Sequence, residues 1–118
     1  MAKIMSKPVV PESSTMPFKV ESGYEPLAAV LQAALDQAQN GKGNKCHANG
    51  KPFLSQPIMT ESRELGAGFV VGQSRKKILE SFNCSDHDRA VEDLLGAIVY
   101  VAANVILRRE HQNGQNAV

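Results

Sequence analysis

The C-terminal third of the chain carries the longest helical periodicity in the sequence. Its apolar stripe extends over about 25 residues and consists of Val91, Leu94, Leu95, Ile98, Ala102, Val105 and Ile106. Ser85 is expected to open this helix, because Asp86 and Asp88 would then place carboxylates in the first turn, where they complement the helix dipole. The signals expected to close the helix are Arg108, Arg109 and Gly114.

A second helical pattern, residues 60–82, is separated from the first by residues 83–85 alone. So short a connection predicts an antiparallel helical hairpin, in which facing residues have numbers that add to roughly 169. Gly66, Gly68 and Gly72 interrupt the pattern, and each weakens a helix by about 1 kcal/mol relative to Ala. Two interpretations stay open: Gly68 and Gly72 admit another helix or a ligand close to the backbone, or the helix breaks near Gly66.

The N-terminal half predicts one more helix after a non-helical start. Prolines in residues 1–22 exclude a helix there and permit short extended pieces at 7–10 and 16–20. A helix is predicted over 26–40, because Pro26 suits a first helical position and Gly41 supplies a stop. The predicted fold class is mainly α, with an extended N-terminal segment (1–22), a single helical-hairpin domain (23–113) and a C-terminal tail (114–118).

The segment between the first helix and the hairpin is the most distinctive in charge. Residues 40–58 are rich in Gly, Asn and Pro, so we expect a structured loop rather than a regular element. No Asp or Glu occurs between Asp36 and Glu61. The same interval contains the basic residues Lys42, Lys45, His47 and Lys51. The sequence therefore predicts a cationic loop.

The predicted hairpin brings Arg63, Arg108 and Arg109 to the end where this loop arrives. Backbone N–H groups of a Gly-rich loop bind anions, and arginines make bidentate contacts with them. We therefore expect a small anionic ligand at this end. Glu61 and Glu110 are possible ion-pair partners of Arg108 and Arg109, and such pairs would compete with an anionic ligand. The alternative is a solvated loop whose lysines serve solubility.

Other side chains of the loop extend the candidate site. His47 and Asn49 are polar residues of the same loop, and Phe53 either stacks on a base or plugs the core. The complete set of predicted ligand-binding residues is Lys42, Lys45, His47, Asn49, Phe53, Arg63, Arg108 and Arg109.

Composition excludes several other classes. The net charge of +1 argues against binding to a DNA or RNA duplex through bulk phosphate neutralisation. No apolar run approaches the ~18 residues of a membrane span, and no signal peptide is recognised, so a cytoplasmic protein is expected. Cys46 and Cys84 fall at opposite ends of the predicted hairpin and are expected to be free thiols. The histidines show no metal-ligand spacing, so neither a metal nor another cofactor is expected.

An enzymatic alternative rests on two groups of carboxylates. Glu61 and Glu64, with a second group formed by Asp88, Glu92 and Asp93, superficially match the magnesium site of MazG-like helical nucleotide pyrophosphohydrolases. The hairpin register places Glu64 about 20 Å from Glu92, too far to share one ion. We expect these carboxylates instead to cap helices and to pair with Arg109, Lys76 and Lys77 across the hairpin. A protein-binding inhibitor of a host defence complex is a further alternative.

Three blocks of the sequence carry a resemblance to a known family. They are GKGNKCHANGKPFLSQPI, GAGFVVGQSRKKILES and AVEDLLGAIVYVAANVI, within about residues 24–109. The chain resembles small bacteriophage proteins of the Thoeris anti-defence protein 1 type, which share a helical hairpin with anti-CBASS protein 2.

The resemblance implies a non-enzymatic sponge of the host cytoplasm. Such a protein binds and sequesters cyclic nucleotide signals of anti-phage defence, including cyclic ADP-ribose variants and cyclic oligonucleotides, without cleaving them. It also implies a homo-oligomer, which agrees with the surplus apolar surface of the C-terminal helix. Lys45, Arg108 and Arg109 would then meet ligand phosphates, and Asn49 and His47 would meet ligand hydroxyl groups.

Overall fold

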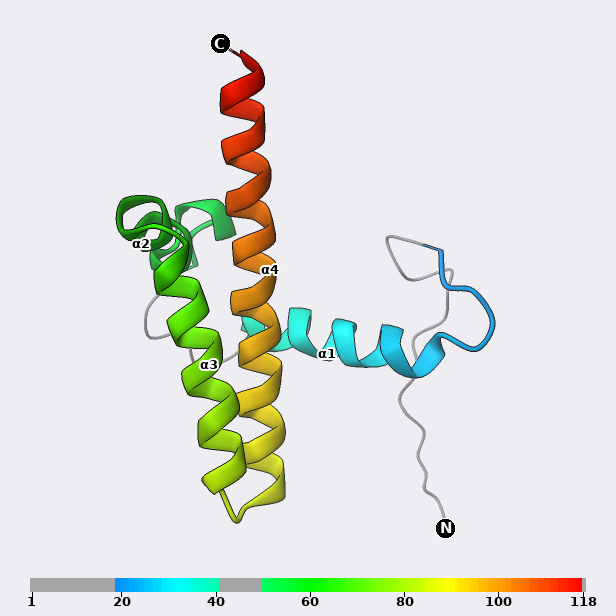
Figure 1. The fold of residues 1–118 in the computed structure, drawn as a ribbon. Helices are drawn as coiled ribbons and strands as arrows, with labels where there is room; N and C mark the ends of the chain where they lie inside the picture. The colour runs from blue at the N-terminus through cyan, green and yellow to red at the C-terminus, as the bar shows by residue number, and fades with distance from the viewer. Residues whose placement is uncertain (1–18, 41–49, 118) are drawn as a thin grey trace.

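The computed structural model describes residues 19–40 and 50–117, and every regular element among them is a helix. The elements are α1 (Glu25–Asn40), the short 3-10 helix η3 (Phe53–Ser55), α2 (Pro57–Leu65), α3 (Ala67–Asn83) and α4 (His87–Ala117) (Figure 1). The described residues contain no β-strand. The predicted mainly α class is therefore confirmed. The extended piece expected at 7–10 and the first part of the piece expected at 16–20 lie outside the described residues, and residues 19–20 belong to no regular element.

The helices α3 and α4 form the antiparallel hairpin (Figure 1). Three residues, 84–86, connect them, and the two helices lie side by side along the whole of α3. Phe69 on α3 packs edge-on against Tyr100 on α4, with the ring centroids 6.5 Å apart and the ring planes at 75°. These two residues have the numerical sum expected from the predicted register. The register predicted from the connection length is therefore confirmed at this pair.

The ends of α4 differ from the predicted ones. The helix begins at His87, because Asp86 is its cap: Oδ1 of Asp86 accepts the backbone N–H groups of Asp88 at 3.0 Å and Arg89 at 3.4 Å. At the other end α4 continues through Gly114 to Ala117. Gly114 is not among the described glycines with positive φ, so it provides no left-handed stop. Its only effect is to lower the stability of the helix slightly, because glycine has a low helix propensity.

The segment predicted as one helix over 60–82 is divided at Gly66. This residue has φ +89° and ψ 178°, a conformation that glycine adopts readily and other residues avoid. The break separates α2 from α3, as the second interpretation of the glycines proposed. A Cβ atom placed at Gly68 or Gly72 would meet nothing within 4 Å. None of the described residues therefore packs closely against the backbone at these two glycines.

The core lies where α2 meets the open end of the hairpin. Its buried side chains are Met59, Val70, Ala103 and Leu107. Half-buried residues that pack against them are Phe53, Ile58, Phe69, Tyr100 and Ile106. Ser62 of α2 is also buried, and its hydroxyl donates to the carbonyl of Ile58 one turn earlier, so its polar group is satisfied. The core is thus concentrated at one end of the hairpin.

Helix α1 crosses α4 away from that core (Figure 1). It begins at Glu25 rather than Pro26 and ends at Asn40, close to the predicted bounds. Its C-terminal half contacts α4, where Nε2 of Gln37 donates to the carbonyl of Glu92 at 3.0 Å. Its N-terminal half projects beyond the hairpin (Figure 1). The solvent-exposed apolar residues of α1 are Leu27, Val30, Leu31 and Leu35.

We predict that Gly66→Ala lowers the free energy of unfolding by about 1–3 kcal/mol, because Ala is strained at this backbone conformation. Space is not the reason, since a Cβ atom at Gly66 meets nothing within 4 Å. Gly72→Ala is the matched control: it lies inside α3 with equally open surroundings and should stabilise by about 0.5–1 kcal/mol. Urea unfolding followed by circular dichroism measures both. Equal effects of the two substitutions would contradict the prediction.

Candidate functional site

The structure describes half of the predicted ligand-binding set. Phe53, Arg63, Arg108 and Arg109 are described, whereas Lys42, Lys45, His47 and Asn49 lie outside the described residues. Cys46 also lies outside them, and Cys84 at the hairpin turn is a free thiol. The described part of the site therefore consists of the open end of the hairpin, formed by η3, α2 and the last turns of α4.

Arg63 is the most extensively bonded side chain at this end. Its Nε and one terminal nitrogen donate to the two carboxylate oxygens of Glu110, each at 3.0 Å. Its other terminal nitrogen donates to the carbonyl of Leu54 at 2.9 Å. One guanidinium thus joins α2, η3 and α4 in a bidentate arrangement, and any ligand that used it would have to displace Glu110.

The ion pair shifts the titration of both partners. The hydrogen bond from Arg63, with the attraction of its positive charge, holds the pKa of Glu110 below its ordinary value of 4.5. The hydrogen bond to Glu110 correspondingly raises the pKa of Arg63. Both side chains are about one-third exposed, so water screens the pair. Glu110 is therefore ionised and engaged at neutral pH.

The observed ion pairs differ from two pairings that the sequence suggested. Glu110 was a possible alternative partner of Arg108 or Arg109, but it pairs with Arg63 on α2. Lys76 was expected to pair across the hairpin, but its ammonium lies 4.0 Å from the carboxylate of Glu80, one turn further along the same helix. The physical reason for the first difference is the break at Gly66, which lets α2 turn across the end of α4.

Arg108 and Arg109 are exposed and make no ion pair with the described residues. Successive helical residues are rotated by about 100°, so Arg108 lies about 160° around α4 from Glu110. The three arginines therefore share one end of the hairpin, as predicted, but not one face of it. Arg108 and Arg109 together form a cationic surface that no described carboxylate neutralises, whereas the guanidinium of Arg63 is engaged by Glu110 and by the carbonyl of Leu54.

Phe53 and Lys51 show how the loop returns to the hairpin. Phe53 packs against the core cluster that contains Leu107, which is the position of a core plug, the alternative to a stacking platform. The carbonyl of Lys51 accepts a hydrogen bond of 2.7 Å from Nε2 of Gln56, and the Lys51 side chain is exposed. The end of the carboxylate-free segment is thus fixed beside the C-terminal turns of α4.

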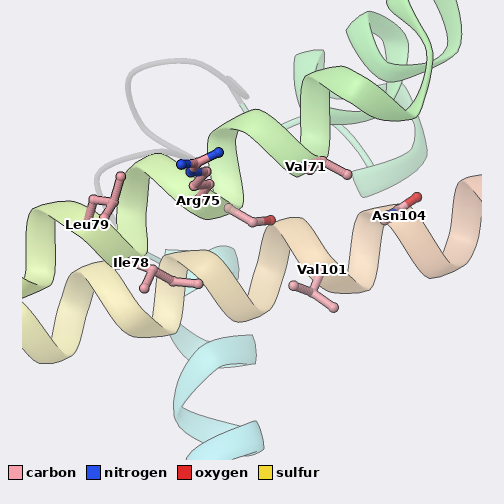
Figure 2. A pocket seen from close by; sticks show the side chains of 7 residues that line it. Val71, Arg75, Ile78, Leu79, Val101 and Asn104 are labelled. Carbon is pink, nitrogen blue, oxygen red and sulfur yellow. The ribbon is translucent and has the colours of Figure 1, made fainter.

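A separate concave feature lies in the middle of the hairpin and was not predicted from the sequence. It is an open groove of about 340 Å³ between α3 and α4 (Figure 2). Its lining residues are Val71, Ser74, Arg75, Ile78, Leu79, Val101 and Asn104. Four of the seven are aliphatic, so the groove suits an apolar partner rather than a small polyanion. The exposed apolar positions of the two helices were the sequence signal that could have indicated it.

The carboxylates that suggested an enzyme are distributed over several elements. Glu61 and Glu64 belong to α2, whereas Glu92 lies in the first half of α4, beside α1. Within the described ranges, no three His, Cys, Asp or Glu side chains gather into a group that would hold a metal ion.

Helix α4 is unusually apolar for its degree of burial. Over His87–Gly114 it is long and apolar enough to cross a membrane by length and composition, with a mean hydropathy of 1.8 in its best window. Only 17% of that window is buried. The sequence prediction excluded a membrane span, but by length and composition this helix could form one, because its most apolar 18 residues include at most two charged side chains. One such helix is weak evidence of a membrane protein, and the cytoplasmic location stays a prediction.

Comparisons of the chain with protein-family models, with curated proteins and with solved structures found no match. The functional argument therefore rests on the residues of this chain and on the resemblance of its sequence blocks described above.

We predict that Glu110→Gln destabilises the protein at neutral pH and that the loss disappears in acid. The folded-state pKa of Glu110 is lowered, so its ionised form stabilises the fold above its ordinary pKa, and this stabilisation is lost as the pH falls through the folded-state value. Thermal unfolding of both proteins at neutral and acidic pH measures the difference, which should be small for an exposed pair. Glu64→Gln is the control and should match the unsubstituted protein at neutral pH, because Glu64 is an exposed residue of α2 that makes no ion pair with the described residues.

Proposed function

We propose that this protein is a non-enzymatic binding protein that sequesters cyclic nucleotide signals of bacterial anti-phage defence in the host cytoplasm. The ligand class comes from the sequence resemblance to phage sponge proteins. The observation that carries the proposal is the exposed pair Arg108 and Arg109 at the end of the hairpin to which the carboxylate-free segment returns.

The chemistry of that end suits a phosphate-containing ligand. Arg108 and Arg109 have no carboxylate partner among the described residues, so an anion gains their charge without breaking an ion pair. Lys51 adds a further exposed cation where the loop rejoins η3. Arg63 contributes indirectly, because its bonds to Glu110 and Leu54 hold α2 and η3 against the same end of α4.

Native mass spectrometry against a panel of cyclic nucleotides, with the ligand recovered after denaturation, tests the proposal. Recovery of an intact cyclic nucleotide supports sequestration. Recovery of a cleaved product would favour a MazG-like pyrophosphohydrolase instead. Absence of any bound nucleotide, together with capture of a host defence complex, would favour the protein-binding inhibitor.

We predict that Arg108→Ala and Arg109→Ala each weaken nucleotide binding by about ten- to a hundred-fold, because each removes one charge-assisted contact. Isothermal titration calorimetry with the cyclic nucleotide that is recovered intact measures the affinity. Both side chains are exposed, so the helical content should not change.

Arg75→Ala is the matched control for this prediction. Arg75 is also exposed but lines the groove between α3 and α4 rather than the open end. It should bind like the unsubstituted protein. Loss of binding in Arg75→Ala with full binding in the other two variants would place the site in the groove and contradict the assignment.

A further inference from the structure

The groove between α3 and α4 has the shape that a third helix would fill. It lies where the two antiparallel helices run side by side (Figure 2). On α3 its lining residues extend from Val71 to Leu79, which is about 12 Å along the axis at 1.5 Å per residue. No residue of α1 or α2 lines the groove. The described helices of the chain therefore leave it uncovered over about two helical turns.

Exposed apolar residues form one row on each of the two helices along the groove. Val71 and Ile78 of α3 are seven residues apart. Leu94 and Val101 of α4 have the same separation, and Val105 follows four residues later. These side chains are between 41% and 54% exposed. Residues separated by four or seven positions lie on one face of a helix, and such rows receive the apolar face of a further helix.

Two polar groups of the groove are available to a partner. Arg75 is the only charged residue among the lining residues, its side chain is exposed, and no carboxylate among the described residues forms an ion pair with it. On the opposite wall, the side-chain amide of Asn104 makes no hydrogen bond with the described residues. The hydroxyl of Ser74 differs, because it donates to the carbonyl of Val70 at 2.8 Å. The groove thus combines apolar rows with one positive charge.

We propose that the groove binds an amphipathic α-helix of a partner protein, whose apolar residues pack between α3 and α4 and whose aspartate or glutamate pairs with Arg75. Charge complementarity decides for an acidic partner, because a helix without a carboxylate would cover the Arg75 guanidinium and leave it unpaired. The amide of Asn104 supplies a hydrogen bond that fixes the register of the partner helix. The groove shares no residue with the proposed nucleotide site at Arg108 and Arg109, so the two sites are separate.

Other occupants fit the groove less well. A small polyanion would meet aliphatic side chains and a single cation. A flat lipid surface does not fill a concave site between two helices. The α4 helix of a second copy supplies no carboxylate for Arg75, because residues 94–107 contain no charged side chain.

A panel of fluorescent helical peptides tests the proposal by fluorescence anisotropy with the full chain. Each peptide has about fifteen residues, with leucines at alternating spacings of three and four on an alanine and glutamine background. The peptides differ only in the position of a single glutamate among the leucines. We expect at least one of them to bind. Replacing its glutamate with glutamine should weaken binding about ten-fold, because the charge-assisted contact to Arg75 is lost.

A charge exchange identifies the contact. Arg75→Glu should lose the glutamate peptide and should bind the peptide with lysine at that position about ten times more tightly than the glutamate peptide. A purely structural role of Arg75 would not reverse this preference. Val101→Glu should abolish binding of every peptide, because it places a carboxylate in the apolar groove. Val71→Glu, on the other wall, should do the same and decides the question if Val101→Glu loses helical content.

Val30→Glu is the matched control, because Val30 is an exposed valine of α1 that does not line the groove, and this variant should bind the peptide fully. The proposal is overturned if no peptide binds, if the glutamate and glutamine peptides bind equally, or if Val30→Glu alone loses binding. Sedimentation velocity and flotation with phospholipid vesicles examine the other occupants. An oligomer that Val101→Glu dissociates, or vesicle binding that Val101→Glu abolishes, would assign the groove to a second copy or to a membrane and would overturn the proposal as well.

Discussion

The three-residue connection between α3 and α4 is the constraint on which the other elements depend. So short a turn keeps the ends of the two helices together, and here the helices run antiparallel and in contact. The register that follows sets Phe69 against Tyr100 and places residues 100–102 of α4 opposite the start of α3. The buried cluster around Met59 forms at this end because α2 is held there, and the last turns of α4 emerge beside it.

Much of this arrangement could be predicted from the sequence, because hydrophobic periodicity and connection length are local properties. They located α1, the hairpin and its register. The exact caps could not be read as well: Ser85 and Asp86 are both good caps, and only the backbone geometry selects Asp86. Gly66 and Gly114 show the same limit. Gly66 ends α2, whereas Gly114 lies inside α4 without interrupting it. The backbone conformation of a glycine depends on whether tertiary packing favours a turn at that position.

The candidate site was harder to predict than the fold, since it depends on which charges pair. Sequence spacing placed Arg63, Arg108 and Arg109 at one end but could not show that Glu110 would choose Arg63. That choice depends on the direction in which α2 leaves Gly66. Phe53 was ambiguous for a related reason, because an aromatic residue in a loop stacks on a ligand or fills a core according to the residues beneath it. In this protein the core residues around Leu107 lie beneath Phe53, so it fills the core. The groove between α3 and α4 was not predicted, because the apolar residues of these helices indicated only surplus apolar surface and not a concave site.

The division at Gly66 also gives the molecule two levels of local stability. Helix α2 has nine residues, too few to persist alone, and it is attached to the hairpin through Met59, Ser62 and the bonds of Arg63. Helices α3 and α4 support one another over a much longer contact. Opening of α2 with η3 therefore requires less free energy than separation of the hairpin, and their amide hydrogens should exchange with solvent first. Because Gly66 separates α2 from the hairpin, α2 and η3, which pack beside Arg108 and Arg109, are the part of the described core that opens most readily.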